Sequence, residues 1–218
     1  MNLSHPMTSL VRSLEGRIFT TLARTTDGLT GSRVAHLIEH ASNPGIQTAL
    51  KRMVLEGTVL SRRVGSASVY ELNREHLLWP AIETLVEATN EVVHSLEARI
   101  VTEVQAVLGT REARIVTLAF FGSVARGTST ANSDIDLVAY FPLTVDDEAA
   151  ERVVSALTSK VPRWTGNECN IYALSGADAV ALKSADDPLL LSWHQDSRTF
   201  NGPDLRTILG AATVSDSR

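Results

Sequence analysis

The chain has 218 residues, of which 44% are apolar, and a formal net charge of −5. These values are typical of a folded protein with one or two domains and exclude a largely disordered chain. No run approaches the roughly 18 apolar residues of a membrane-spanning helix, so we expect no membrane partner. A single cysteine, Cys169, and a first segment without the pattern of a secretory signal favour a cytoplasmic protein.

The charge is divided unevenly along the chain. Residues 1–78 contain nine Lys/Arg and six Asp/Glu, whereas residues 79–218 contain eleven and nineteen. A basic front and an acidic back predict two domains with different partners.

The front segment has the pattern of three helices and a hairpin. We expect helices over 10–24, 31–40 and 43–56, and strands over 58–64 and 68–72, joined at Gly65-Ser66-Ala67. Thr30 is the expected N-cap of the second helix, and Asn43 is the expected N-cap of the third, with Pro44 at its first position.

This pattern resembles the winged-helix transcription regulators of bacteria over approximately residues 8–78. The resemblance implies a DNA-binding domain over 1–78 whose third helix lies in the major groove and whose hairpin contacts phosphates or the minor groove. The side chains that would contact DNA are Asn43, Gln47, Thr48 and Lys51 on the third helix and Arg62 and Arg63 on the hairpin. The alternative is a protein-interaction module, because the segment is only modestly basic.

A long helical pattern follows Trp79-Pro80 and runs from Ala81 to about Leu108 with near-heptad apolar spacing, interrupted at Thr89 and Glu103. We expect residues 79–108 to form a connecting helix. It would pack onto the sheet of the next domain or pair with a second chain. Since winged-helix regulators often bind two half-sites, we expect a homodimer.

A glycine-serine turn follows the apolar, β-rich run 114–121. Gly122 lets the backbone approach a ligand closely, and the Ser123 hydroxyl can bond a phosphate oxygen. A short helix is expected to start at Val124, and Arg126 adds a positive charge beside the turn.

Paired carboxylates open the next predicted strand, 135–141. Asp134 and Asp136 are two residues apart, so they project from the same face. Two adjacent carboxylates repel each other unless a cation lies between them, and Mg²⁺ is commonly held by one or two carboxylates together with substrate phosphates. The pattern therefore predicts a site for a nucleoside triphosphate with Mg²⁺ or Mn²⁺.

The sequence Gly-Ser-x-Ala-Arg-Gly-(x5)-Ser-Asp-x-Asp-Leu resembles the minimal nucleotidyltransferases of the DNA polymerase beta-like superfamily. The resemblance implies an α/β domain with a mixed sheet over 109–218, which makes the whole chain α+β. It also implies that Gly122 and Ser123, with Arg126 and Ser133 nearby, bind ATP or another triphosphate. Asp134 and Asp136 would bind the metals.

Members of that family carry a third acidic residue on a later strand. The candidate strand here is 168–174, and the aligned position is Asn170, with Glu168 two residues earlier on the same face. Asparagine cannot act as a general base. Three alternatives stay open: Glu168 replaces the missing acid, two carboxylates catalyse weakly, or the domain binds nucleotide without turnover.

Three further helices are predicted in the second half of the chain. Thr144-Val145-Asp146-Asp147 resembles a capping box before a helix that runs to about Lys160, and 177–187 and 188–193 also have helical patterns.

With these two segments in this order, the chain resembles a group of bacterial proteins in which a winged helix is fused to a minimal nucleotidyltransferase. The first functional hypothesis is an enzyme that transfers a nucleoside monophosphate, from ATP by preference, onto a protein or another acceptor. Related minimal transferases resemble antitoxins that nucleotidylate a partner toxin. The second hypothesis is a DNA-binding regulator that senses nucleotide, and the third is an antitoxin that acts by binding its partner.

Overall fold

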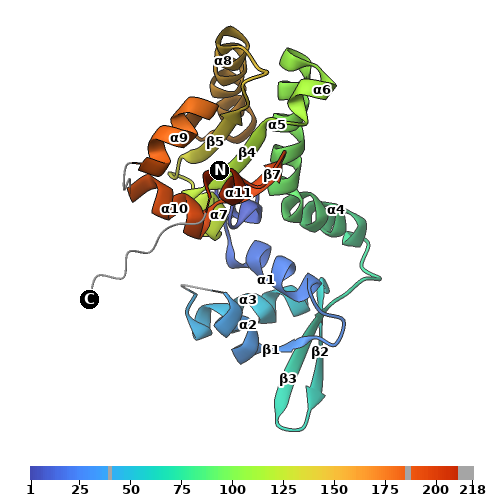
Figure 1. The fold of residues 1–218 in the computed structure, drawn as a ribbon. Coiled ribbons are helices and arrows are strands. Elements are labelled where there is room, and N and C mark those ends of the chain that lie inside the picture. The colour runs from blue at the N-terminus through green and yellow to red at the C-terminus, as the bar shows by residue number, and fades with distance from the viewer. Residues whose placement is uncertain (39–40, 185–187, 211–218) are drawn as a thin grey trace, which may run out of the picture. The chain divides into compact units, whose positions relative to one another are not determined.

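The computed structural model describes residues 1–38, 41–184 and 188–210 (Figure 1). The chain divides into two compact units: one is His5–Val92, and the other is Met1–Ser4 together with Val93–Arg218. The predicted helix ends at His40 and Asp187 lie outside the described residues. Each unit is described below by itself.

The unit His5–Val92 contains a helical cluster and a small antiparallel sheet of order β1-β3-β2. Its elements are η1 (Pro6–Ser9), α1 (Leu14–Ala23), β1 (Leu29–Thr30), α2 (Gly31–Leu37), α3 (Asn43–Leu55), β2 (Val59–Val64), β3 (Ala67–Leu72) and α4 (Trp79–Asn90). Ile18 and Leu22 of α1 are buried and belong to one core cluster with Ile46 and Leu50 of α3. Figure 1 shows the β2–β3 hairpin extending beyond the three helices.

Of the two predicted helix N-caps in this unit, one is wrong and one is confirmed. Ser42, rather than Asn43, is the N-cap of α3, because the Gly45 N–H donates to Ser42 Oγ at 3.2 Å and Asn43 is already helical. A serine one residue earlier caps equally well, and Pro44 is tolerated within the first turn. Thr30 caps α2 as predicted by accepting from the Arg33 N–H at 3.3 Å.

The predicted continuous helix over 81–108 is wrong. The structure has two helices there, α4 and α5 (Val92–Leu108), separated at Glu91. The Thr89 hydroxyl donates to the carbonyls of Leu85 and Val86 at 2.8 and 3.0 Å. Such bonds from a threonine to the preceding turn bend helices. Thr84 and Thr102 make the same kind of bond within helices that continue, so Thr89 alone does not explain the break.

The second unit is built on a four-stranded mixed sheet of order β6-β5-β4-β7, in which β5 and β6 are parallel and the other pairs antiparallel. After α5 its elements are α6 (Thr110–Ala113), β4 (Thr117–Phe121), α7 (Gly122–Arg126), β5 (Ile135–Phe141), α8 (Asp147–Thr165), β6 (Cys169–Ser175), α9 (Gly176–Ser184), α10 (Pro188–Asp196), β7 (Arg198–Asn201) and α11 (Leu205–Leu209). The sequence did not predict α6 or β7. All four residues of β7 are half-buried, so the strand has no alternating pattern to recognise.

Helices cover both faces of this sheet. Ala119, Phe121 and Val138 pack with Trp193 of α10 and Leu205 of α11. On the opposite face the helices α5 and α8 lie side by side, since Lys160 Nζ is 2.6 Å from Glu103 Oε2. The sheet is therefore covered on both faces, and its two edge strands among the described residues are β6 and β7.

The N-terminus of α8 also differs from the predicted capping box. Asp146 is the N-cap, accepting from the Ala149 N–H at 2.7 Å, rather than Thr144. The helix continues through Pro162 to Thr165, five residues beyond the predicted end. Buried Val161 and Thr165 on its inner side hold that last turn against the unit.

Candidate active site

The parallel pairing of β5 and β6 brings three polar side chains together. The register pairs Asp136 with Asn170, and Asp134 lies just before β5. Asn170 Nδ2 donates to Asp134 Oδ2 and to Asp136 Oδ1, each at 3.3 Å. Asp134 and Asp136, which are close in sequence, thus form one polar cluster with Asn170, which is 34 positions from Asp136.

The backbone of Gly122 lies close to the Asp136 carboxylate of this cluster. The β4–β5 register places Phe121 opposite Asp136, and Gly122 follows with φ = +63°. A Cβ built at Gly122 would lie 2.7 Å from Asp136 Oδ2. Both the left-handed backbone and the missing side chain are therefore needed to keep the Asp136 carboxylate where it is.

Ser123 lies in the first turn of α7, next to Gly122. Its carbonyl accepts from the Thr128 N–H at 2.9 Å, and Gly127, with φ = +69°, ends the helix. The Ser123 side chain is half-buried and makes no hydrogen bond to any described residue. Its hydroxyl is therefore available to a ligand beside Asp136.

Arg126 and Ser133, the two other predicted nucleotide-binding residues, are held by protein partners. Arg126 Nη1 is 2.5 Å from Asp196 Oδ2 at the end of α10. Ser133 Oγ accepts from the Thr130 N–H at 2.9 Å and stabilises the turn before Asp134. The Asp196 partner lies 70 residues from Arg126, so no local pattern could reveal it.

Glu168 is exposed and precedes β6. Its carbonyl accepts from the Ile135 N–H at 2.9 Å, which extends the parallel register by one step and aligns Glu168 with Asp134. Its carboxylate forms no hydrogen bond or ion pair within the described part of the chain. Asn170, and not Glu168, is the residue in contact with both carboxylates.

The donor set fits a magnesium ion. Asp134 and Asp136 supply hard oxygen ligands, and substrate phosphates can complete the coordination. No group of three or more His, Cys, Asp or Glu gathers anywhere in the described ranges. A site of this kind depends on the substrate for its remaining ligands.

An aromatic cluster that the sequence did not predict lies beside these residues. The rings of Phe121, Tyr172 and Trp193 meet edge to face, with centroids 5.6 to 5.9 Å apart. Tyr172 is 41% exposed and shares a strand face with Asn170. The i, i+2 spacing from Asn170 could have indicated Tyr172, whereas Trp193 is placed by the packing of α10.

Cys169 is a buried structural thiol. Burial raises its pKa to about 12, and the charges of Asp136 and Glu168 add to the effect. A thiol of this kind stays protonated and unreactive at neutral pH.

The predicted DNA-contacting residues lie on two exposed surfaces of the first unit. Asn43, Thr48 and Lys51 are exposed on α3, while Gln47 is half-buried against Gly31. Arg62 and Arg63 are exposed on β2, where Arg62 Nη2 donates to the Asp27 carbonyl at 3.0 Å. Arg52 turns toward α1 and pairs with Glu15.

None of the described helices is both long and apolar enough to cross a membrane. No curated protein matches the chain.

A solved structure described as "Crystal structure of the toxin-antitoxin with AMP-PNP" matches at 17% identity and a TM-score of 0.31, over 47% of this chain and 73% of that chain. Residues 101–164 match the sequence family described as "Nucleotidyltransferase domain". The matched residues include Gly122, Ser123, Asp134 and Asp136 and end before β6. Residues 101–164, which hold the glycine-serine turn and both aspartates of the candidate site, are thus similar to a nucleotidyltransferase domain.

Proposed function

We propose that the second unit transfers a nucleoside monophosphate from a triphosphate, with ATP as the expected donor, onto an acceptor hydroxyl. The observation that carries the proposal is the convergence of Asp134, Asp136 and Asn170 beneath Gly122. The nucleotidyltransferase match over 101–164 supports it.

In this reaction an acceptor oxygen attacks the α-phosphorus. The bond from the α-phosphorus to the bridging oxygen breaks, pyrophosphate leaves with the electron pair, and the proton of the acceptor hydroxyl passes to water. When bound, magnesium neutralises the negative charge on the phosphate oxygens. Asp134 and Asp136 hold it there, and Asn170 orients both carboxylates through its amide.

The residues of the Gly122 turn bind the triphosphate. Gly122 permits close approach of the phosphates to the backbone, and the free Ser123 hydroxyl donates to a phosphate oxygen. Tyr172 presents an exposed ring on which a nucleobase can stack. Arg126 orders α7 through its pair with Asp196 and acts on the phosphates indirectly.

The test is incubation of the purified full chain with α-labelled nucleotides, Mg²⁺ and cell extract. We expect label to appear on a macromolecule with wild type and not with Asp134→Ala/Asp136→Ala. Nucleotide binding by calorimetry without label transfer would instead support a nucleotide sensor. Absence of both binding and transfer would refute the proposal.

We propose DNA binding as a second function, carried by the first unit as a winged helix. The supporting observation is that Asn43, Thr48 and Lys51 on α3 and Arg62 and Arg63 on the β2–β3 hairpin are all exposed. Helix α3 would enter the major groove, and the hairpin would follow the adjacent backbone. As in many such regulators, two copies would bind two half-sites as a dimer.

A mobility-shift assay with the chain's own promoter region tests this second function. We expect binding that weakens as salt rises. In a plot of log binding constant against log salt concentration, Arg62→Ala/Arg63→Ala should reduce the slope by about two, because two phosphate contacts are lost. Binding that is insensitive to salt, or no binding at low salt, would leave a protein-interaction role for this unit.

A further inference from the structure

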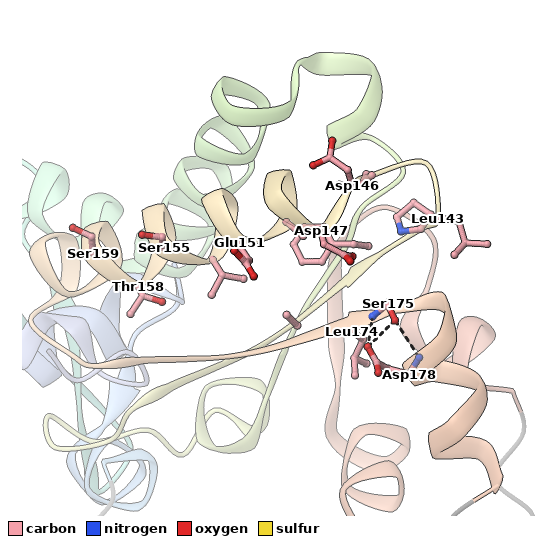
Figure 2. A pocket seen from close by; sticks show the side chains of 16 residues that line it. Leu143, Asp146, Asp147, Glu151, Ser155, Thr158, Ser159, Leu174, Ser175 and Asp178 are labelled. Atoms are coloured by element: carbon pink, nitrogen blue, oxygen red, sulfur yellow. Dashed lines mark hydrogen bonds between the residues drawn. The ribbon is translucent and has the colours of Figure 1, made fainter.

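A groove lies beside the free edge of the sheet, at the opposite end of β6 from Asn170. It has a volume of about 960 Å³ and is formed by the ends of β5 and β6, a solvent-accessible flank of α8 and the start of α9. At roughly 3.3 Å per residue, Asn170 and Ser175 are about 16 Å apart along the strand. Figure 2 shows Asp147 and Glu151 on α8, with Ser175 and Asp178 across from them.

The β6 edge that borders this groove is unpaired. Strand β6 is the last in the order β6-β5-β4-β7, and no other described segment pairs with its outer side. The Ile135 N–H bonds the Glu168 carbonyl, so in this parallel pair the backbone of Glu168, Asn170 and Tyr172 turns toward β5. The N–H and C=O groups of Ile171 and Ala173 therefore turn outward. An unpaired edge of this kind is a template for another strand.

The groove carries only one sign of charge. Four of its lining residues are acidic, namely Asp146, Asp147, Glu151 and Asp178, and none is Lys or Arg. The hydroxyl and N–H of Ser175 donate to the Asp178 carboxylate and lower its pKa. The rest of the lining is largely apolar and includes Leu143, which is 88% exposed.

We propose that the β6 edge and this acidic groove bind an extended, basic segment of a partner protein. The segment adds as a fifth strand beside β6 and pairs its backbone with Ile171 and Ala173. Its Lys or Arg side chains meet Asp147 and Glu151, and its apolar side chains cover Leu143. Peptide binding does not require nucleotide transfer, because the acidic groove lies at the opposite end of β6 from Asn170.

The probe is a displayed library of random eight-residue peptides, selected on the full chain. We expect the enriched peptides to carry a net positive charge with basic and apolar residues alternating. Synthetic copies of these peptides are then titrated by fluorescence anisotropy against wild type and variants. Enrichment of acidic or uncharged peptides would overturn the proposal.

Two pairs of variants separate the edge and charge contributions. Ala173→Pro removes the outward N–H and should weaken binding by at least about tenfold, while Ala173→Val, which keeps that N–H, should bind like wild type. Glu151→Gln should weaken binding about threefold, and raising salt should reduce the difference. Glu148→Gln on the same helix, where Glu148 pairs with Arg152 outside the groove, should have no effect.

Equal binding by Ala173→Pro and wild type would refute strand addition, and equal losses in Glu151→Gln and Glu148→Gln would refute the acidic groove. Light scattering provides the remaining comparison. A dimer that is present in wild type and Ala173→Val but lost in Ala173→Pro would assign the edge to a second copy of the chain and overturn the proposal. Because this experiment measures peptide binding, a failure of the peptide-binding proposal is distinguishable from a failure of the proposed nucleotidyl transfer, which is measured by label transfer.

Discussion

Replacing Asn170 with aspartate would restore a third carboxylate at the candidate site. In the structure the Asn170 amide donates to Asp134 and Asp136 at 3.3 Å. A carboxylate oxygen at the same place would accept no hydrogen bond from them and would repel both. Two like charges about 3.3 Å apart in a water-like dielectric cost about 1 kcal/mol per pair, and the lost hydrogen bonds cost about 1 kcal/mol in total.

We therefore expect Asn170→Asp to destabilise the metal-free protein by about 3 kcal/mol. For a unit of this size that corresponds to a fall of roughly 10 °C in the melting temperature. Mg²⁺ should reverse most of the loss, because three carboxylates bind the cation more tightly than two. The rise in melting temperature on adding Mg²⁺ should thus be larger for the variant than for wild type.

The measurement is thermal unfolding with and without Mg²⁺, followed by fluorescence. Asn132→Asp is the matched control, since it adds the same charge in the neighbouring exposed turn without contacting Asp134 or Asp136. If Asn170→Asp melted like wild type without Mg²⁺, or responded to Mg²⁺ no more than wild type, the three side chains would not form one site.

Three further predictions follow from the same geometry. Gly122→Ala should abolish nucleotide binding, measured by calorimetry, because its Cβ would displace Asp136. Gly127→Ala, with a similar φ and nothing within 4 Å, should cost only about 1 kcal/mol of folding free energy and retain binding. Glu168→Gln should retain most label transfer, whereas Asp136→Asn should lose at least about 100-fold; similar losses would make Glu168 the missing acid. Native Cys169 should resist iodoacetamide at pH 9, because burial raises its pKa to about 12. The contribution of the protonated thiol to stability should be complete below the ordinary thiol pKa and be lost as pH rises toward 12. The free energy of unfolding, measured in urea, should therefore fall more between pH 8 and 10.5 for wild type than for Cys169→Ala.

The local patterns of the sequence predicted most of the elements but not their irregularities. Strand β5 was predicted with its observed bounds, since an apolar run between turn residues is a strong local signal. The break at Glu91 was not predicted, because the apolar spacing of 81–108 is nearly continuous. Strand β7 was missed because its pairing with β4 is a long-range contact.

The sequence by itself determined the chemistry of the candidate site. Gly122, Ser123, Asp134 and Asp136 are close in sequence, so spacing alone predicts a metal and nucleotide site. Only the tertiary structure decided which residue completes it, because Asn170 reaches both carboxylates through the parallel β5–β6 register. The Asp196 partner of Arg126 and the acidic groove beside β6 likewise arise from packing between distant segments. Residues adjacent in sequence share a face by local geometry, whereas contacts between distant segments depend on strand order and helix packing, which local patterns do not specify.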